Sequence, residues 1–156
     1  MIAEGKEVIL KVKGNSMLPF IRHDFDSVLL TKPGDLKVGD IILAYTTAEK
    51  YVLHRIWDIR GEQITLMGDG NLRGTEHCER SQVAGLVKAI VLGDTGERVD
   101  PYSPSMVRKA RMWRKLLPYR VYLLKVYRLN HGLDGGWGGF LKRKFLRSFC
   151  FGTLSR

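Results

Sequence analysis

Short apolar runs separated by turn residues follow one another through the first hundred residues, and this pattern constrains the fold more than any other feature of the chain. Val8, Leu10 and Val12 alternate with the side chains between them, as expected for a strand with one buried face. Six such runs joined by short connections predict a mainly β domain. The five further strands are expected at residues 27–31, 40–45, 51–59, 63–67 and 82–92.

The charge of the chain changes near Asp100-Pro101-Tyr102-Ser103-Pro104. Residues 1–100 carry 13 basic and 15 acidic side chains, whereas residues 101–156 carry 13 basic side chains and a single acidic one, Asp134. The net charge of +10 therefore belongs to the last third of the chain. We predict a β domain over residues 1–100 and a basic, partly helical extension over residues 101–156.

The extension is expected to contain two helices separated by a proline. A helix starting at Pro104 would align Met106, Ala110, Trp113, Leu116 and Leu117 on one face, and Pro118 should interrupt it. A second helix is predicted over 119–129, followed by a glycine-rich connector (132–139) and a basic, aromatic tail (140–151).

Three interpretations of the basic extension remain open. Its charges can form a solvated helical face, or its interleaved basic and aromatic side chains can bind an anionic membrane surface or an acidic partner. Nucleic acid is the third and weakest partner, because no recognisable nucleic-acid module is present. Trp113, Leu116, Leu117 and Leu124 can instead cover the sheet, in which case truncation would expose the core.

Several classes of protein find little support in the sequence. With 44% hydrophobic and 27% charged residues the chain is expected to fold, and its two cysteines give no disulfide framework. No signal peptide or membrane-spanning run is visible, which predicts a cytoplasmic location or one peripheral to a membrane. No phosphate-binding loop or recurrent metal-ligand spacing occurs, so no cofactor and no metal are expected, apart from adventitious binding around His77 and Cys78.

A serine lies between a glycine and a proline just after the first predicted strand, in Gly14-Asn15-Ser16-Met17-Leu18-Pro19. Such a loop can expose a hydroxyl beside free backbone N–H groups, which is the arrangement that a nucleophile with an oxyanion hole requires. A serine in this setting is also a common turn former. The hypothesis of a catalytic Ser16 therefore needs a partner that can accept its proton.

His54 is the candidate base. Strand alternation places it on the face shared by Val52 and Ile56, and an imidazole can accept a serine proton at neutral pH. If the pair is catalytic, Ser16 Oγ and the ring should lie at roughly 2.6–3.2 Å, or somewhat farther apart without substrate. A histidine that merely satisfies its hydrogen bonds on a strand is the alternative, and the rival histidines are His23, His77 and His131.

Two acidic residues are candidates for the third catalytic role, which is to orient the imidazole and stabilise its charged form. Asp69 lies in Gly68-Asp69-Gly70-Asn71, and Glu76 follows a few residues later. Asp69 can equally be an ordinary turn aspartate, so this choice stays open.

These segments, with Val38-Gly39-Asp40-Ile41-Ile42 between the first two, resemble the type I signal peptidase family and its LexA-like relatives over roughly residues 8–92. In that family a Ser-Met-x-Pro motif holds the nucleophile, a Gly-Asp-Ile/Val strand follows, and later motifs supply the base and an acidic residue. The resemblance implies a signal-peptidase/LexA-like β fold. Because the base position is occupied by His54, it also implies the archaeal and endoplasmic-reticulum branch, whose base is histidine.

The resemblance implies a serine endopeptidase that cleaves precursor, signal or leader peptides through an acyl-enzyme, without a cofactor. Ser16, His54 and either Asp69 or Glu76 would be catalytic, while Ser16, Met17 and Pro19 would form the oxyanion and substrate-binding loop. Gly70 splits the family's Asp-Asn step, and this departure motivates the alternative hypothesis. In that alternative the chain is a non-catalytic member that binds a membrane, an acidic protein or nucleic acid through its extension.

Overall fold

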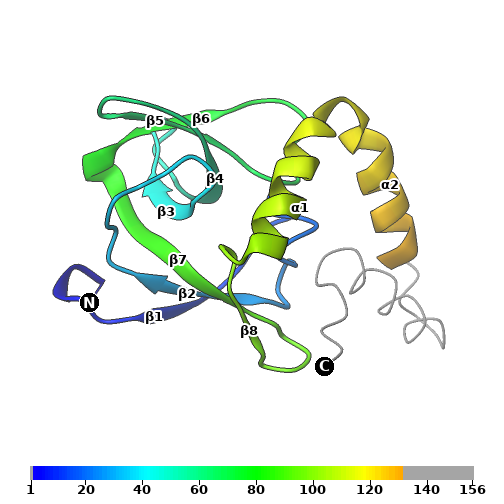
Figure 1. Cartoon of the computed structure of the whole chain (residues 1–156), viewed down its shortest axis with the longest axis horizontal. Coiled ribbons are helices and arrows are strands. Elements are labelled where there is room, and N and C mark those ends of the chain that lie inside the picture. The colour runs from blue at the N-terminus through cyan, green and yellow to red at the C-terminus, as the bar shows by residue number, and fades with distance from the viewer. Residues whose placement is uncertain (1, 132–156) are drawn as a thin grey trace.

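The computed structural model describes residues 2–131 of the 156-residue chain. Eight strands form one antiparallel sheet in the order β1-β2-β7-β3-β4-β5-β6, with β8 paired to β7 (Figure 1). The sheet is curled, and the long strand β7 joins its two parts because it pairs with β2 on one side and with β3 on the other. The strands are β1 (Val8–Lys11), β2 (Ser27–Thr31), β3 (Ile41–Tyr45), β4 (Tyr51–Arg60), β5 (Gln63–Met67), β6 (Glu76–Glu79), β7 (Val83–Val91) and β8 (Arg98–Val99).

The mainly β fold class is confirmed, and all six predicted strands are present with small differences at their ends. Two strands were not predicted. The sequence of β6, Glu-His-Cys-Glu, has one apolar side chain and therefore no hydrophobic alternation, and β8 has only two residues. Both strands form because they pair with a neighbour that is already in the sheet.

Two apolar clusters form the interior of the described chain. One lies within the β3–β6 part of the sheet and contains Ile42, Ile56, Ile64 and Leu66. The other joins the β1, β2 and β7 part of the sheet to the helices. Its fully or nearly fully buried members include Met17, Ile21, Val28, Leu30, Ile41, Val87, Ile90, Met106, Trp113 and Leu124.

The helical segment is α1 (Pro104–Lys115), a 3₁₀ turn (Leu117–Tyr119) and α2 (Arg120–His131). Two further 3₁₀ turns cover Ile2–Glu4 and Arg80–Gln82. Pro104 starts α1 and Pro118 lies in the turn between the helices, as predicted from the missing N–H group of proline. The predicted connector (132–139) and tail (140–151) lie outside the described residues.

The change in charge near residue 100 is not a break in the hydrophobic core. Met106 and Trp113 of α1 and Leu124 of α2 are buried in the same cluster as Met17 and Phe20. Leu116 and Leu117 are half-buried. Removing the helices would therefore expose apolar surface of the β part. Among the described residues, none of the helices has both the length and the apolar character needed to cross a membrane.

Candidate active site

Ser16 lies in the loop between β1 and β2 and is half-buried. Gly14, two residues earlier, has a φ of 93°, a left-handed conformation that glycine adopts without steric cost, and its N–H donates to His23 Nδ1 at 2.8 Å. The carbonyl of Ser16 accepts a hydrogen bond of 2.7 Å from the N–H of Gly70. The loop is thus fixed by the His23 side chain before the serine and by the Gly70 backbone at the serine itself.

Met17 and Pro19 were predicted to belong to the oxyanion and substrate-binding loop. The structure buries both side chains, and Met17 belongs to the main apolar cluster. Burial of these apolar side chains fixes the loop to the core, so contact with a substrate at these two positions would have to involve the backbone.

His54 lies on β4 and is only 4% exposed. Its Nδ1 is 3.0 Å from Glu76 Oε2, an arrangement in which Nδ1–H donates to the carboxylate and leaves the lone pair on Nε2. Strand pairing explains this contact. β5 lies between β4 and β6, and Leu66 of β5 is opposite Ile56 of β4 on one side and Glu76 of β6 on the other. Glu76 is therefore close to the part of β4 that carries His54. Burial lowers the pKa of His54 below its ordinary value, and the carboxylate of Glu76 opposes that shift in part.

Gly68 lies where the Ser16 loop and His54 meet. A Cβ at this position would clash with the carbonyl oxygen of Ser16 and would stand 3.0 Å from His54 Nε2. The Ser16 backbone and the free nitrogen of the ring therefore converge on one residue that has no side chain. Any larger residue would push them apart.

The expected hydrogen bond between Ser16 Oγ and His54 is not formed. Within residues 2–131, Ser16 Oγ makes no hydrogen bond at all. In peptidases without substrate this contact is often long or poorly aligned and shortens when the substrate binds. The structure thus brings the two residues together at Gly68 without joining their side chains.

Asp69 forms its ion pair with Arg55, the residue after His54, and not with the imidazole. The guanidinium binds the carboxylate through Nε (2.9 Å) and Nη2 (2.7 Å), and its Nη1 donates to the carbonyl of Gly39 at 2.8 Å. Arg55, Asp69 and Gly39 all lie in or directly beside the segments that resemble the signal peptidase motifs. Of the two acidic candidates, Glu76 contacts the ring, whereas Asp69 is paired with Arg55 and acts on the ring only through its charge at longer range.

Two residues of the helical segment donate hydrogen bonds to the loop between β5 and β6 (residues 68–75), called the site loop below. Trp113 Nε1–H donates to the carbonyl of Asp69 at 2.7 Å, and Arg120 Nη1 donates to the carbonyl of Asn71 at 2.9 Å. Arg120 is 1% exposed, and its Nε has no hydrogen-bond partner among the described residues. Burial lowers the pKa of Arg120, and Asp69 is the nearby carboxylate that opposes this shift.

These two residues were not assigned to the site by sequence reasoning, which placed Trp113 in the core and Arg120 among the basic charges. A signal was nevertheless present. Arg120 lies four residues before Leu124, so the two share one face of the second helix, where a basic side chain stands next to an apolar one.

A groove of about 1010 Å³ begins beside the site loop. It is lined on one side by residues 70–73 of that loop and on the other by Leu117, Pro118 and Val121 of the helical segment. Gly70 contributes both to this groove and to the hydrogen bond with the Ser16 carbonyl. The groove is therefore adjacent to the serine loop.

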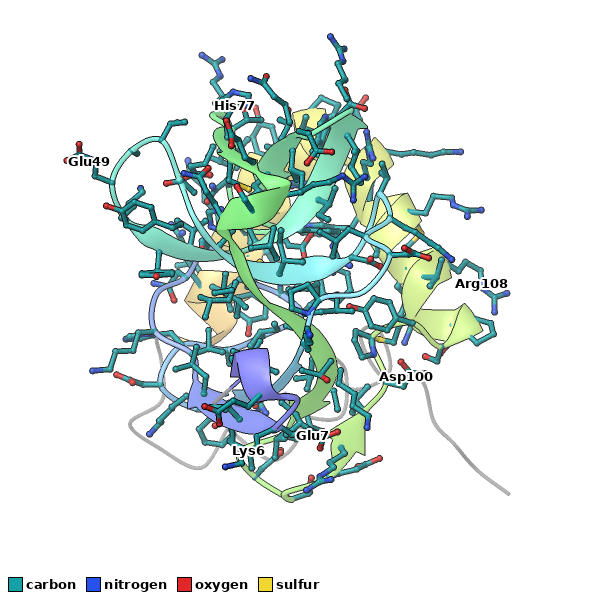
Figure 2. All side chains as sticks on the ribbon, turned by 90° about the vertical axis from the view of Figure 1, so that its left-hand side faces the viewer. Lys6, Glu7, Glu49, His77, Asp100 and Arg108 are labelled. Atoms are coloured by element: carbon teal, nitrogen blue, oxygen red, sulfur yellow. The ribbon has the colours of Figure 1, made fainter. Side chains whose placement is uncertain are left out.

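The rival histidines are placed elsewhere. His23 accepts the hydrogen bond from Gly14, and His77 lies at the outer edge of the sheet beside Thr65 (Figure 2). The side chain of His131 is outside the described part of the structure. Within that part, no group of three or more histidine, cysteine, aspartate and glutamate side chains is arranged to hold a metal ion.

Comparison with protein families identifies a Peptidase S24-like match over residues 1–88, more than half of the chain. No curated protein matches the chain. The matched region contains Ser16, His54, Asp69 and Glu76, and the match agrees with the predicted LexA and signal peptidase superfamily. The chain therefore belongs to the family of Peptidase S24-like proteins.

Proposed function

We propose that this protein is a serine endopeptidase with a Ser16/His54 catalytic pair of the histidine-base type. The observation that carries the proposal is the convergence of the Ser16 backbone and His54 Nε2 on Gly68, with Nδ1 of the same ring 3.0 Å from Glu76. A nucleophile, a base and an acidic group that orients the base are the three parts of a triad. Family membership supports the same reaction class.

Each residue has a defined step in this mechanism. Ser16 Oγ attacks the scissile carbonyl carbon while His54 Nε2 accepts the hydroxyl proton, and Glu76 stabilises the resulting imidazolium. The C–N bond then breaks as Nε2 returns the proton to the leaving amine, which leaves an ester on Ser16. Water, deprotonated by His54, hydrolyses this ester and regenerates the enzyme.

The depressed pKa of His54 suits the role of a base. A buried imidazole that stays neutral at neutral pH can accept the proton without first losing one. We assign Asp69 a positioning role through Arg55, and the backbone N–H of Ser16 a contribution to the oxyanion hole.

The proposed substrates are precursor, signal or leader peptides bound in an extended conformation. The groove between residues 70–73 and Leu117–Val121 is adjacent to the serine loop, and we propose that it holds part of the peptide. Apolar lining with a few polar groups is typical of such sites.

The test is cleavage of a mixed peptide library by the purified full-length protein, with products identified by mass spectrometry. Ser16→Ala and His54→Ala should each abolish most cleavage while their thermal unfolding stays close to that of the wild type. A trapped adduct on the wild type that is absent from Ser16→Ala would identify the nucleophile. Unchanged cleavage by either variant would refute the pair, and absence of cleavage by the wild type would favour the non-catalytic alternative.

A further inference from the structure

The solvent-facing side of α2 is apolar. Arg120 and Leu124 turn inward and are buried, whereas Tyr119, Tyr122, Val126 and Leu129 point away from the body and are 57–68% exposed. The spacing of Tyr122, Val126 and Leu129 places them on one face of α2, and Tyr119 lies in the 3₁₀ turn directly before the helix. A surface helix normally carries polar residues on this side, so an apolar stripe here indicates a partner.

The charged side chains of the two helices are all basic. Lys125 and Arg128 are exposed on α2, and Arg111, Arg114 and Lys115 are exposed on α1. Arg108 also projects away from the body (Figure 2). No acidic residue occurs between residues 101 and 131. The partner must therefore accept apolar side chains at its centre and present negative charge at the rim.

We propose that the outer face of α2 docks on an anionic lipid bilayer. A helix lying in the interface inserts its apolar face among the acyl chains, while basic side chains bind the headgroups. Tyrosines 119 and 122 suit this position because their rings are apolar and their hydroxyls reach water. Each basic residue near the surface adds about fivefold in affinity, the equivalent of about 1 kcal/mol.

Other partners fit the face less well. A second copy of the chain would bring Lys125 and Arg128 against like charges, with no acidic residue in α1 or α2 to offset them. A nucleic acid would use the basic side chains but would leave the apolar stripe in water. The bilayer uses both features.

Docking through this face places the site loop near the lipid. The inner side of α2 holds Asn71 through Arg120, so about one helix diameter, ~10 Å, separates that loop from the bilayer. The docking proposal rests on the helix surface alone and does not require Ser16 to be catalytic.

The experiment is co-sedimentation of the full-length protein with phosphatidylcholine vesicles and with vesicles that also contain phosphatidylglycerol, at low and high salt. Tyr122→Ser/Leu129→Ser should weaken binding to anionic vesicles by at least about tenfold, because two apolar side chains are lost from the contact. The matched control is Ile9→Ser/Tyr51→Ser, which removes exposed apolar side chains from the sheet and should bind like the wild type.

A second pair of variants tests the charges. Lys125→Gln/Arg128→Gln should weaken binding by about 25-fold at low salt and much less at high salt. Lys32→Gln/Lys37→Gln, which removes two exposed lysines from the β part, should have no effect. Thermal unfolding of all four variants should match the wild type, since every changed side chain is at the surface.

Three results would overturn the proposal. The first is equal binding to neutral and anionic vesicles at low salt, and the second is wild-type binding by the α2 variants. The third is self-association or transfer RNA binding, without vesicle binding, that the α2 variants remove. Loss of peptidase activity in Ser16→Ala with unchanged vesicle binding separates this proposal from the proposed catalytic function.

Discussion

Replacing Trp113 by phenylalanine tests how the helical segment supports the site. The indole N–H donates to the Asp69 carbonyl at 2.7 Å in a buried position, and the ring meets Phe20 edge to face with 6.4 Å between centroids. Phenylalanine keeps an aromatic ring in the core but has no N–H group. The carbonyl of Asp69 would then be buried without this donor.

Two contributions determine the size of the effect. A buried acceptor without a partner costs about 1–3 kcal/mol, and the smaller ring leaves space worth about 1 kcal/mol. Together they should lower the free energy of unfolding by about 2–4 kcal/mol, a large part of the ~5–15 kcal/mol typical of a domain. For a chain of this length the melting temperature should fall by about 4–16 °C.

Urea unfolding followed by circular dichroism measures this change, and Trp57→Phe is the matched control. Trp57 lies on β4 with Arg114 stacked 3.9 Å above its ring, and its indole nitrogen makes no hydrogen bond within residues 2–131. Its replacement should cost less than about 1 kcal/mol. Turnover of a soluble peptide by Trp113→Phe should fall about 10- to 100-fold, because the loop that holds Gly68 against Ser16 shifts.

Equal unfolding midpoints for Trp113→Phe and Trp57→Phe would refute the energetic argument, since the hydrogen bond would then contribute nothing measurable. Destabilisation without loss of turnover would instead show that the helices stabilise the fold but do not position the site loop.

The other predictions concern the catalytic groups. Peptidase activity should be full at neutral pH and fall as the pH drops through the lowered pKa of His54, so the midpoint of the acid limb should lie below 6.5; a midpoint above that value would exclude this base. Glu76→Gln should reduce kcat by roughly a hundredfold or more and move the acid limb to still lower pH, because the carboxylate raises the pKa of the imidazole; an unchanged pH–rate profile would contradict the contact. Gly68→Ala should reduce activity at least about tenfold, whereas Gly34→Ala, where a Cβ meets nothing within 4 Å, should leave it unchanged; similar activities of the two variants would contradict the convergence at Gly68.

Local patterns in the sequence were sufficient for six of the eight described strands, for both helices and for the order of the site motifs. Alternation along Tyr51–Ile56 correctly reports which side of β4 is buried, and the prolines at 104 and 118 mark where helices begin and stop. The same reasoning is wrong for β1, where Leu10 was expected on a buried face but is 37% exposed. The position of His54 on the buried face of its strand follows from the alternation along β4. These features depend on residues a few positions apart, so they can be predicted without knowing the fold.

Pairings between distant segments could be decided only by the tertiary structure. Glu76 reaches His54 because β6, a strand with one apolar residue, pairs with β5, and Asp69 is directed to Arg55 by the loop that follows β5. Trp113 and Arg120 reach the same loop across more than forty residues of sequence because α1 and α2 complete the core. Register and packing between elements determine these contacts, and no pattern within a single segment encodes them.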